Sequence, residues 1–467
     1  MKMENFWDFN AWGSLHVMAS LLLSLLAANA LKRAIPILQA SLVPTSVLGG
    51  AILMIIAGIY KLVTGDVMYN TVFFGGNGIA TLEVITYHTL ALGFIASTFK
   101  SSDGKMSKQR TIEIFNTGVT TVSTYLLQAV VGFGITLAAT LIIKDFFSSA
   151  GVLLPFGFGQ GTGQAMNYGT IYETEYGFVG GKSFGLTIAA LGFLSASIGG
   201  VIHLNLLKRR GKIKWDPTVL ETAQPLEEEI QASNEIPMQG SLDKTTIQLA
   251  YVFAAYFLAY LLMLCLGNLL PGMRSVIFGF NFLLGVLAAT LVKIVLKGLR
   301  KNGLMRRQHI NNFLMTRISN FFYDIMVVSG IAAIRLGILE DYWGIILILG
   351  VFGAILTYLY NRAVAKVLFP EYVEEQFLMM YGMLTGTAST GVILLREIDG
   401  QFKTPAADNL VYQNFPAIVF GFPMMLLATL APQKPALTFV ILVVFFVVMN
   451  LLLFRSKIFK LKKKTTV

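Results

Sequence analysis

Residues that build soluble enzymes and metal centres are scarce in this 467-residue chain. It contains one cysteine and four histidines, and 13% of its residues are charged, against 55% that are hydrophobic. A water-soluble domain carries roughly twice that share of charged residues. The sequence has no HExxH metal-binding motif, and Cys265 alone cannot form a disulfide within the chain. These shortages argue against an enzyme, and the mean hydropathy of +0.68 favours a chain embedded in lipid.

Apolar runs of about 20 residues recur along the whole sequence, and each is long enough to cross a bilayer as a helix. The predicted helices lie near residues 11–31, 44–62, 81–99, 112–143, 180–207, 246–270, 276–297, 311–337, 342–365, 406–430 and 436–454. The helix near 112–143 is expected to be long or broken. We therefore predict an all-α polytopic membrane protein.

Lysine and arginine gather in every second loop between these helices. The basic clusters occupy residues 32–33, 100–110, 208–214, 297–307, 362–366 and 455–464. Because cytoplasmic loops are rich in Lys and Arg, this pattern predicts that the N-terminus lies outside and the C-terminus in the cytoplasm. The formal net charge of +11 is thus explained by topology signals, and we expect no nucleic-acid partner.

A polar stretch at residues 209–243, rich in glutamate and proline, divides the helices into two sets and is predicted to be a cytoplasmic linker. The first set, residues 1–208, contains five helices and starts outside. The second, residues 244–432, contains five helices and starts inside, so the two sets are predicted to form an inverted repeat. Residues 433–467 add one transmembrane helix and a basic cytoplasmic tail.

Each half contains a Gly- and Thr-rich segment between its fourth and fifth helices, at about residues 148–176 and 374–399. All the basic loops lie on the cytoplasmic side only if neither segment crosses the bilayer, so we predict two re-entrant hairpins that enter from opposite sides. Irregular backbone at membrane depth is tolerated beside a polar cavity, where its N–H groups can face an anion and its carbonyls a cation. The predicted binding residues are Gly159, Gln160, Gly161, Thr162, Gly163 and Asn167 in the first hairpin, and Thr385, Gly386, Thr387, Ser389 and Thr390 in the second.

Glycine clusters in membrane helices also serve close helix packing, but two clusters in corresponding positions of the two halves favour a binding site. Ionisable residues within the spans are the next candidates, because a charge at membrane depth is costly. His88 and Asp324 occupy similar places in the two halves and are predicted to line the site or to make structural contacts. Arg317, seven residues before Asp324, is expected to pair with it, to meet a substrate carboxylate, or to extend to the membrane interface.

The hairpin motifs resemble those of the bacterial sodium:glutamate symporter family, whose architecture is related to that of 2-hydroxycarboxylate (citrate) transporters. The segment Gly159-Gln160-Gly161-Thr162-Gly163, followed by residues 175–178, is similar to the family's first pore loop, although Gln160 replaces its usual histidine. Residues 386–390 are similar to the second pore loop, and residues 43–50 to the start of the second helix. The resemblance implies a homodimeric transporter of the bacterial cytoplasmic (inner) membrane whose coupling ion is sodium, with no other cofactor.

The leading functional hypothesis is sodium-coupled symport of glutamate or a related small carboxylate or amino acid. Sodium would offset the cost of placing an anion at mid-membrane, and coupling would follow from the two ligands favouring the same state. A proton-coupled or exchange transporter of another organic anion is the alternative. An ion channel has less support, and an enzyme is not expected.

Overall fold

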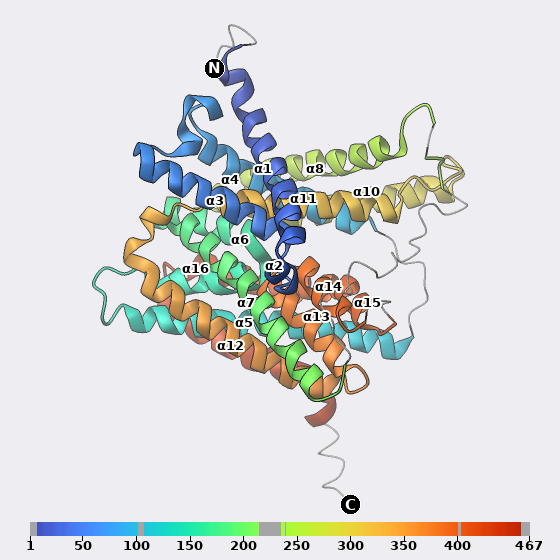
Figure 1. Cartoon of the computed structure of the whole chain (residues 1–467). Helices are drawn as coiled ribbons and strands as arrows, with labels where there is room; N and C mark the ends of the chain where they lie inside the picture. The colour runs from blue at the N-terminus through green and yellow to red at the C-terminus, as the bar shows by residue number, and fades with distance from the viewer. Residues whose placement is uncertain (1–6, 101–106, 214–234, 239, 400–402, 459–467) are drawn as a thin grey trace, which may run out of the picture. The chain divides into compact units, whose positions relative to one another are not determined.

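The computed structural model describes residues 7–100, 107–213, 235–238, 240–399 and 403–458. Within these ranges the chain is all-helical, and an isolated bridge between Glu235 and Gln308 is the one extended pairing. The predicted all-α class is therefore confirmed. Figure 1 colours the helices in chain order and labels most of them.

Nine helices in the described part of the chain are long and apolar enough to cross a membrane. They are α1 Phe9–Ala34, α3 Thr45–Thr64, α4 Gly78–Phe99, α5 Lys108–Ala139, α7 Gly181–Arg209, α8 Lys244–Leu269, α10 Asn281–Lys301, α12 Trp343–Leu368 and α17 Pro435–Leu453. Their lengths match the need of each span to satisfy its own backbone hydrogen bonds in lipid. The chain is thus a multi-pass membrane protein. Of the two possibilities for residues 112–143, the long helix is correct, because α5 runs without a break.

Two of the eleven predicted helices form but are not among these nine candidate spans. The first, α11 (Asn312–Ala332), carries the polar residues Arg317, Asn320 and Asp324 and is not apolar enough to count as a candidate span. The second is divided into α15 (Ala406–Tyr412) and α16 (Asn414–Leu430), so its apolar part is short. All eleven predicted helices therefore form, and whether α11 and α16 also cross the membrane stays a prediction.

The chain forms two compact units, and each takes segments from both sides of the predicted linker. Unit 1 comprises Met1–Leu26, Gly49–Gly104 and Gln224–Ala333, and unit 2 comprises Ala27–Leu48, Lys105–Ala223 and Ile334–Val467. The proposed halves, residues 1–208 and 244–432, describe a sequence symmetry rather than these units. The inverted repeat therefore stays a prediction.

The core of unit 1 is built from α4, α8, α10 and α11. Apolar side chains such as Ile95, Val252 and Phe322 pack together there. Part of the predicted linker is held against this unit, because the Glu235 carboxylate accepts hydrogen bonds of 2.7 Å from both Lys244 Nζ and Asn311 Nδ2. Residues 214–234 and 239 of the linker lie outside the described residues.

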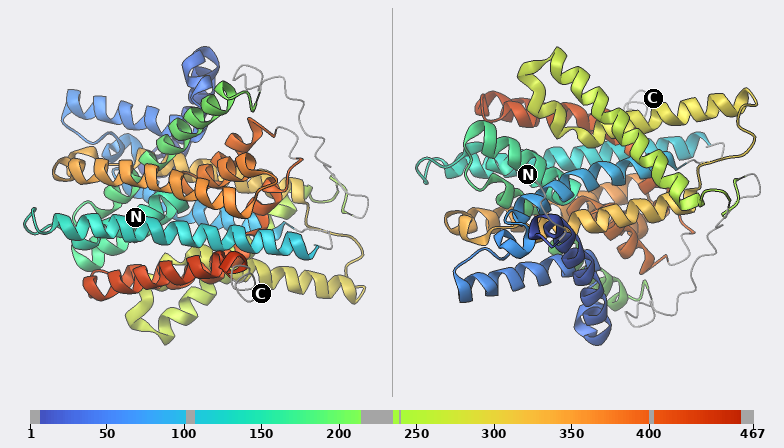
Figure 2. Two further views of the ribbon diagram at one scale, coloured as in Figure 1. Left: turned by 90° about the horizontal axis from the view of Figure 1, so that it is seen from below. Right: turned by 90° about the horizontal axis from the view of Figure 1, so that it is seen from above.

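Unit 2 is built around α5 and contains α6 (Leu153–Tyr176), α7, α12, α13 (Val373–Thr385) and α14 (Ala388–Arg396). The extra helix α17 packs along α5, as the left view of Figure 2 shows. A row of small polar residues on α5 is buried by these neighbours instead of facing lipid; it includes Thr117, Thr120, Thr121, Ser123 and Thr124. Unit 2 also holds both Gly-rich segments, and their geometry is described next.

Candidate functional site

Helix α6 is broken at Gly161. Its φ of +78° and ψ of −171° lie in a region that residues with a Cβ hardly ever adopt. The chain turns back there, because the rings of Phe156 and Tyr168 stack with their centroids 3.8 Å apart. Twelve residues of straight helix would separate them by about 18 Å. The first Gly-rich segment is therefore two helical arms that lie side by side.

A second break separates α13 from α14 at Gly386 and Thr387. Thr387 caps α14 by accepting a hydrogen bond from the Thr390 backbone N–H. The two arms approach so closely that a Cβ added to Gly382 would lie 2.8 Å from the Cα of Gly391. Such contact between backbones requires glycine on both sides. This segment also folds back on itself, as the glycine-rich sequence predicts.

Both breaks lie against the same part of α7. A Cβ added to Gly192 would meet the Thr385 carbonyl oxygen at 2.5 Å and the Phe158 Cα at 3.2 Å. Gln128 of α5 fixes the end of α13, because its Nε2 donates to the Leu384 carbonyl oxygen at 2.9 Å. The two tips, which are more than 220 residues apart in the sequence, are therefore neighbours within unit 2.

The predicted residues of the first segment are brought together at its break. Tyr125 of α5 donates its hydroxyl hydrogen to the Gly159 carbonyl oxygen at 3.0 Å. Thr162 is fully buried, and Asn167 Nδ2 donates to Gln164 Oε1 at 3.3 Å. Gly161 and Gly163 are buried as well, whereas Gln160 is partly exposed. Gln164 was missed from the sequence, although it stands between two predicted residues.

The predicted residues of the second segment line its break. The Thr385 hydroxyl donates to the Tyr381 carbonyl oxygen at 2.6 Å, which leaves its lone pairs as acceptors. Thr385 and Thr390 are fully buried, and Gly386 is buried too. The Thr387 and Thr390 hydroxyl oxygens are 3.4 Å apart. The side chain of Ser389 lies outside the described part of the structure.

Several buried amide atoms near these segments have no hydrogen-bond partner among the described residues. They are Gln160 Nε2, Gln164 Nε2, Gln128 Oε1, Asn409 Oδ1 and Gln413 Oε1. A buried polar atom without a partner costs about 1–3 kcal/mol. The set includes donors suited to an anion and acceptors suited to a hard cation.

A chain of polar contacts continues from α15 to α5. Asn409 Nδ2 donates to Gln376 Oε1 at 3.0 Å, and Gln376 Nε2 donates to Thr117 Oγ1 at 3.1 Å. Tyr372 donates to Glu113 Oε2 at 2.8 Å and accepts from Asn409 Nδ2 at 3.1 Å. These contacts join α5, α13 and α15 through polar groups, whereas a helix surface that faces lipid would be apolar.

The three predicted charge partners belong to unit 1, so their part in the site stays a prediction. His88 Nδ1 lies 2.7 Å from the Tyr256 hydroxyl of α8. The Arg317 guanidinium stands 4.9 Å from the centre of the Phe313 ring. Arg317 and Asp324 are both exposed on α11.

A partly buried ionic cluster at the start of α13 was not foreseen. The Glu374 carboxylate receives hydrogen bonds from Arg362 Nη2 at 2.7 Å and contacts His203 Nε2 at 3.0 Å, while His203 Nδ1 lies 2.7 Å from the Tyr358 hydroxyl. Burial by itself raises the pKa of Glu374, but the hydrogen bonds and charges of His203 and Arg362 outweigh it and lower the pKa to about 2. The signal in the sequence was His203, an isolated histidine in an apolar span, but the sequence did not indicate which residues it would contact.

The chain matches no family model and no curated protein at a significant level. The likeness to sodium:glutamate symporters therefore depends on the motifs around the two breaks.

Proposed function

We propose that this protein is a secondary active transporter that moves glutamate or a related small carboxylate together with sodium across the bacterial cytoplasmic membrane. The observation that carries the proposal is the meeting of two glycine-broken helices against Gly192 within one unit. Broken helices at membrane depth are the elements from which transporters build midplane sites. Their position between the fourth and fifth helices of each half supports re-entrant hairpins in an inverted repeat.

The chemistry at the two breaks suits an anion and a cation together. The second arm of α6 and helix α14 each begin at a tip, so their backbone N–H groups and positive dipole ends can receive a carboxylate. Gln164 Nε2 adds a side-chain donor. The preceding arms end in backbone carbonyls, and with the Gln128 and Gln413 amide oxygens they supply the hard oxygen ligands that sodium prefers. No further cofactor enters this proposal.

The topology within the proposal follows the basic loops, with the N-terminus outside and the C-terminus in the cytoplasm. The likeness to the symporter family adds a homodimer. Because both broken helices belong to unit 2, they can move as one body when substrate and sodium are bound.

A proton-coupled or exchange transporter of another organic anion is the second candidate. The cluster of His203, Glu374 and Tyr358 favours it, because it places a histidine at the start of the second broken helix, and histidines within membrane proteins often belong to proton relays. An ion channel is a third reading with less support.

Uptake into proteoliposomes distinguishes these candidates. We expect labelled glutamate or another carboxylate from a competition panel to accumulate only with an inward sodium gradient, and saturably. Gln164→Ala should reduce uptake about tenfold or more, whereas Gln109→Ala, a change at an exposed glutamine of α5, should leave it intact. Accumulation driven by a proton gradient in sodium-free buffer would favour the second candidate, and no saturable flux of any carboxylate by a folded protein would overturn the proposal.

A further inference from the structure

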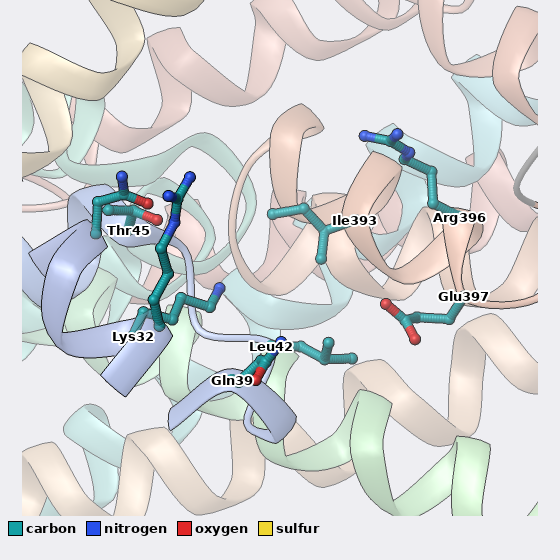
Figure 3. A pocket seen from close by; sticks show the side chains of 9 residues that line it. Lys32, Gln39, Leu42, Thr45, Ile393, Arg396 and Glu397 are labelled. Carbon is teal, nitrogen blue, oxygen red and sulfur yellow. The ribbon is translucent and has the colours of Figure 1, made fainter. Parts of the chain in front are cut away.

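A cleft of ≈ 480 Å³ lies in unit 2 between the end of α1 and the end of α14. Basic side chains from both helices line it, with Lys32 and Arg33 on α1 and Arg396 on α14. Figure 3 shows Lys32 and Glu397 reaching toward the cleft from opposite sides, with the Arg396 guanidinium on the α14 side. The cleft thus contains three cationic groups and one carboxylate.

The charges in the cleft do not cancel. Lys32 Nζ donates to the Val43 carbonyl oxygen at 2.8 Å, and its charge interacts with that of Glu397. Neither Arg33 nor Arg396 has an ion-pair partner among the described residues. Two guanidinium groups therefore remain for an anion, and their planar forks suit the oxygens of a phosphate.

The surface beside the cleft is apolar. Ile37 of α2 (Pro36–Ala40) is 77% exposed, and this short helix has no buried residue. Leu31 of α1, which belongs to the same unit and precedes Lys32, is 38% exposed. A soluble phosphate would leave these side chains uncovered, whereas a phospholipid carries both a phosphate and acyl chains. Basic clusters at the cytoplasmic end of a membrane helix are typical of sites for anionic headgroups.

We propose that the cleft binds the phosphate of an anionic phospholipid through Arg33 and Arg396, with the acyl chains against the exposed apolar residues of α1 and α2. The bound lipid connects α1 with α14, which is the exit arm of the second broken helix. This site stands apart from the proposed transport function, because its test is lipid binding and not flux.

Thermal unfolding of the purified full chain in detergent, titrated with dioleoylphosphatidylglycerol, tests the site. The wild type should be stabilised at lower lipid concentration by this lipid than by dioleoylphosphatidylcholine, which has the same acyl chains. Arg33→Gln and Arg396→Gln should each raise the half-maximal concentration about fivefold, and the double variant about 30-fold, equivalent to about 2 kcal/mol. Arg396→Lys should recover part of the loss, because it restores the charge.

Two comparisons make the proposal refutable. Arg209→Gln removes an exposed cation from the end of α7, away from the cleft lining, and should change the half-maximal concentration less than twofold. An equal loss in this variant would show a general surface-charge effect and overturn the site. Equal stabilisation by glycerol 3-phosphate or inorganic phosphate would show that the occupant is a soluble phosphate, which overturns the lipid.

Discussion

Gly192 of α7 is the position at which the contact between the two broken helices can be tested most directly. The change Gly192→Ala adds one methyl group that would lie 2.5 Å from the Thr385 carbonyl oxygen. Ordinary contacts begin at 3.4 Å, so the end of α13 has to move by roughly 1 Å. A shift of that size strains or breaks the hydrogen bond of 2.9 Å from Gln128 Nε2 to the Leu384 carbonyl oxygen, which is worth about 1 kcal/mol.

The effect should fall on transport more than on folding. Alanine is the better helix former, which offsets part of the lost contact, so we expect the free energy of unfolding to fall by about 1 kcal/mol or less. Misplacement of a binding group by about 1 Å can cost up to 100-fold in rate, so the initial rate of carboxylate uptake should fall at least tenfold. Thermal unfolding in detergent and uptake into proteoliposomes measure the two effects separately.

A matched control separates the added methyl group from its location. Gly58→Ala adds the same group to α3, where no atom lies within 4 Å of the new Cβ, and should leave uptake and stability near those of the wild type. If Gly192→Ala transports at the wild-type rate with the same midpoint of unfolding, the two tips do not meet at α7 as described. Loss of uptake in both variants would equally refute the argument, because it would not depend on the tips.

Three further predictions concern local interactions. Gly161→Ala should lower the free energy of unfolding by about 2 kcal/mol, because alanine is strained at the φ of +78° that Gly161 adopts. Gly58→Ala should not lower it. Equal effects of the two changes would show that backbone strain at Gly161 is not the cause. Glu374→Gln should lower the free energy of unfolding by about 3 kcal/mol at pH 7, because the pKa of Glu374 is about 2 in the folded state against the ordinary 4.5 in the unfolded state. The wild type loses this stabilisation as the pH falls from 4.5 toward 2. Denaturant unfolding should therefore show a smaller difference from the wild type at pH 4, by about 1 kcal/mol, and a constant difference would refute the assignment. Lys244→Met should lower the free energy of unfolding by about 3–5 kcal/mol, because it leaves the Glu235 carboxylate buried without its cation. The double variant Lys244→Met, Glu235→Met should recover most of that stability. If it does not, the ion pair is not the cause of the loss.

The helices could be predicted from the sequence because their cause is local. An apolar run of about 20 residues has to form a helix in lipid, wherever the rest of the chain lies. A break in the first Gly-rich segment was also predictable, because a second Gly-rich segment occupies the corresponding place in the other half, whereas the conformation of Gly161 itself came from the structure. The polar residues of α11 keep it off the set of nine candidate spans, although the helix itself forms as predicted.

The partners of buried polar groups could not be predicted in the same way. His203 and Glu374 are 171 residues apart, and nothing in either segment names the other. Gln128 is 256 residues from Leu384, whose carbonyl oxygen accepts its hydrogen bond. The sequence of a helix indicates which of its faces is polar. Which other helix packs against that face depends on the arrangement of all the helices, and the sequence of the one helix does not contain it. The same reasoning limits the candidate site: glycines located both breaks, whereas the amides of Gln128 and Gln413 could be assigned to it only once α5 and α16 were placed beside them.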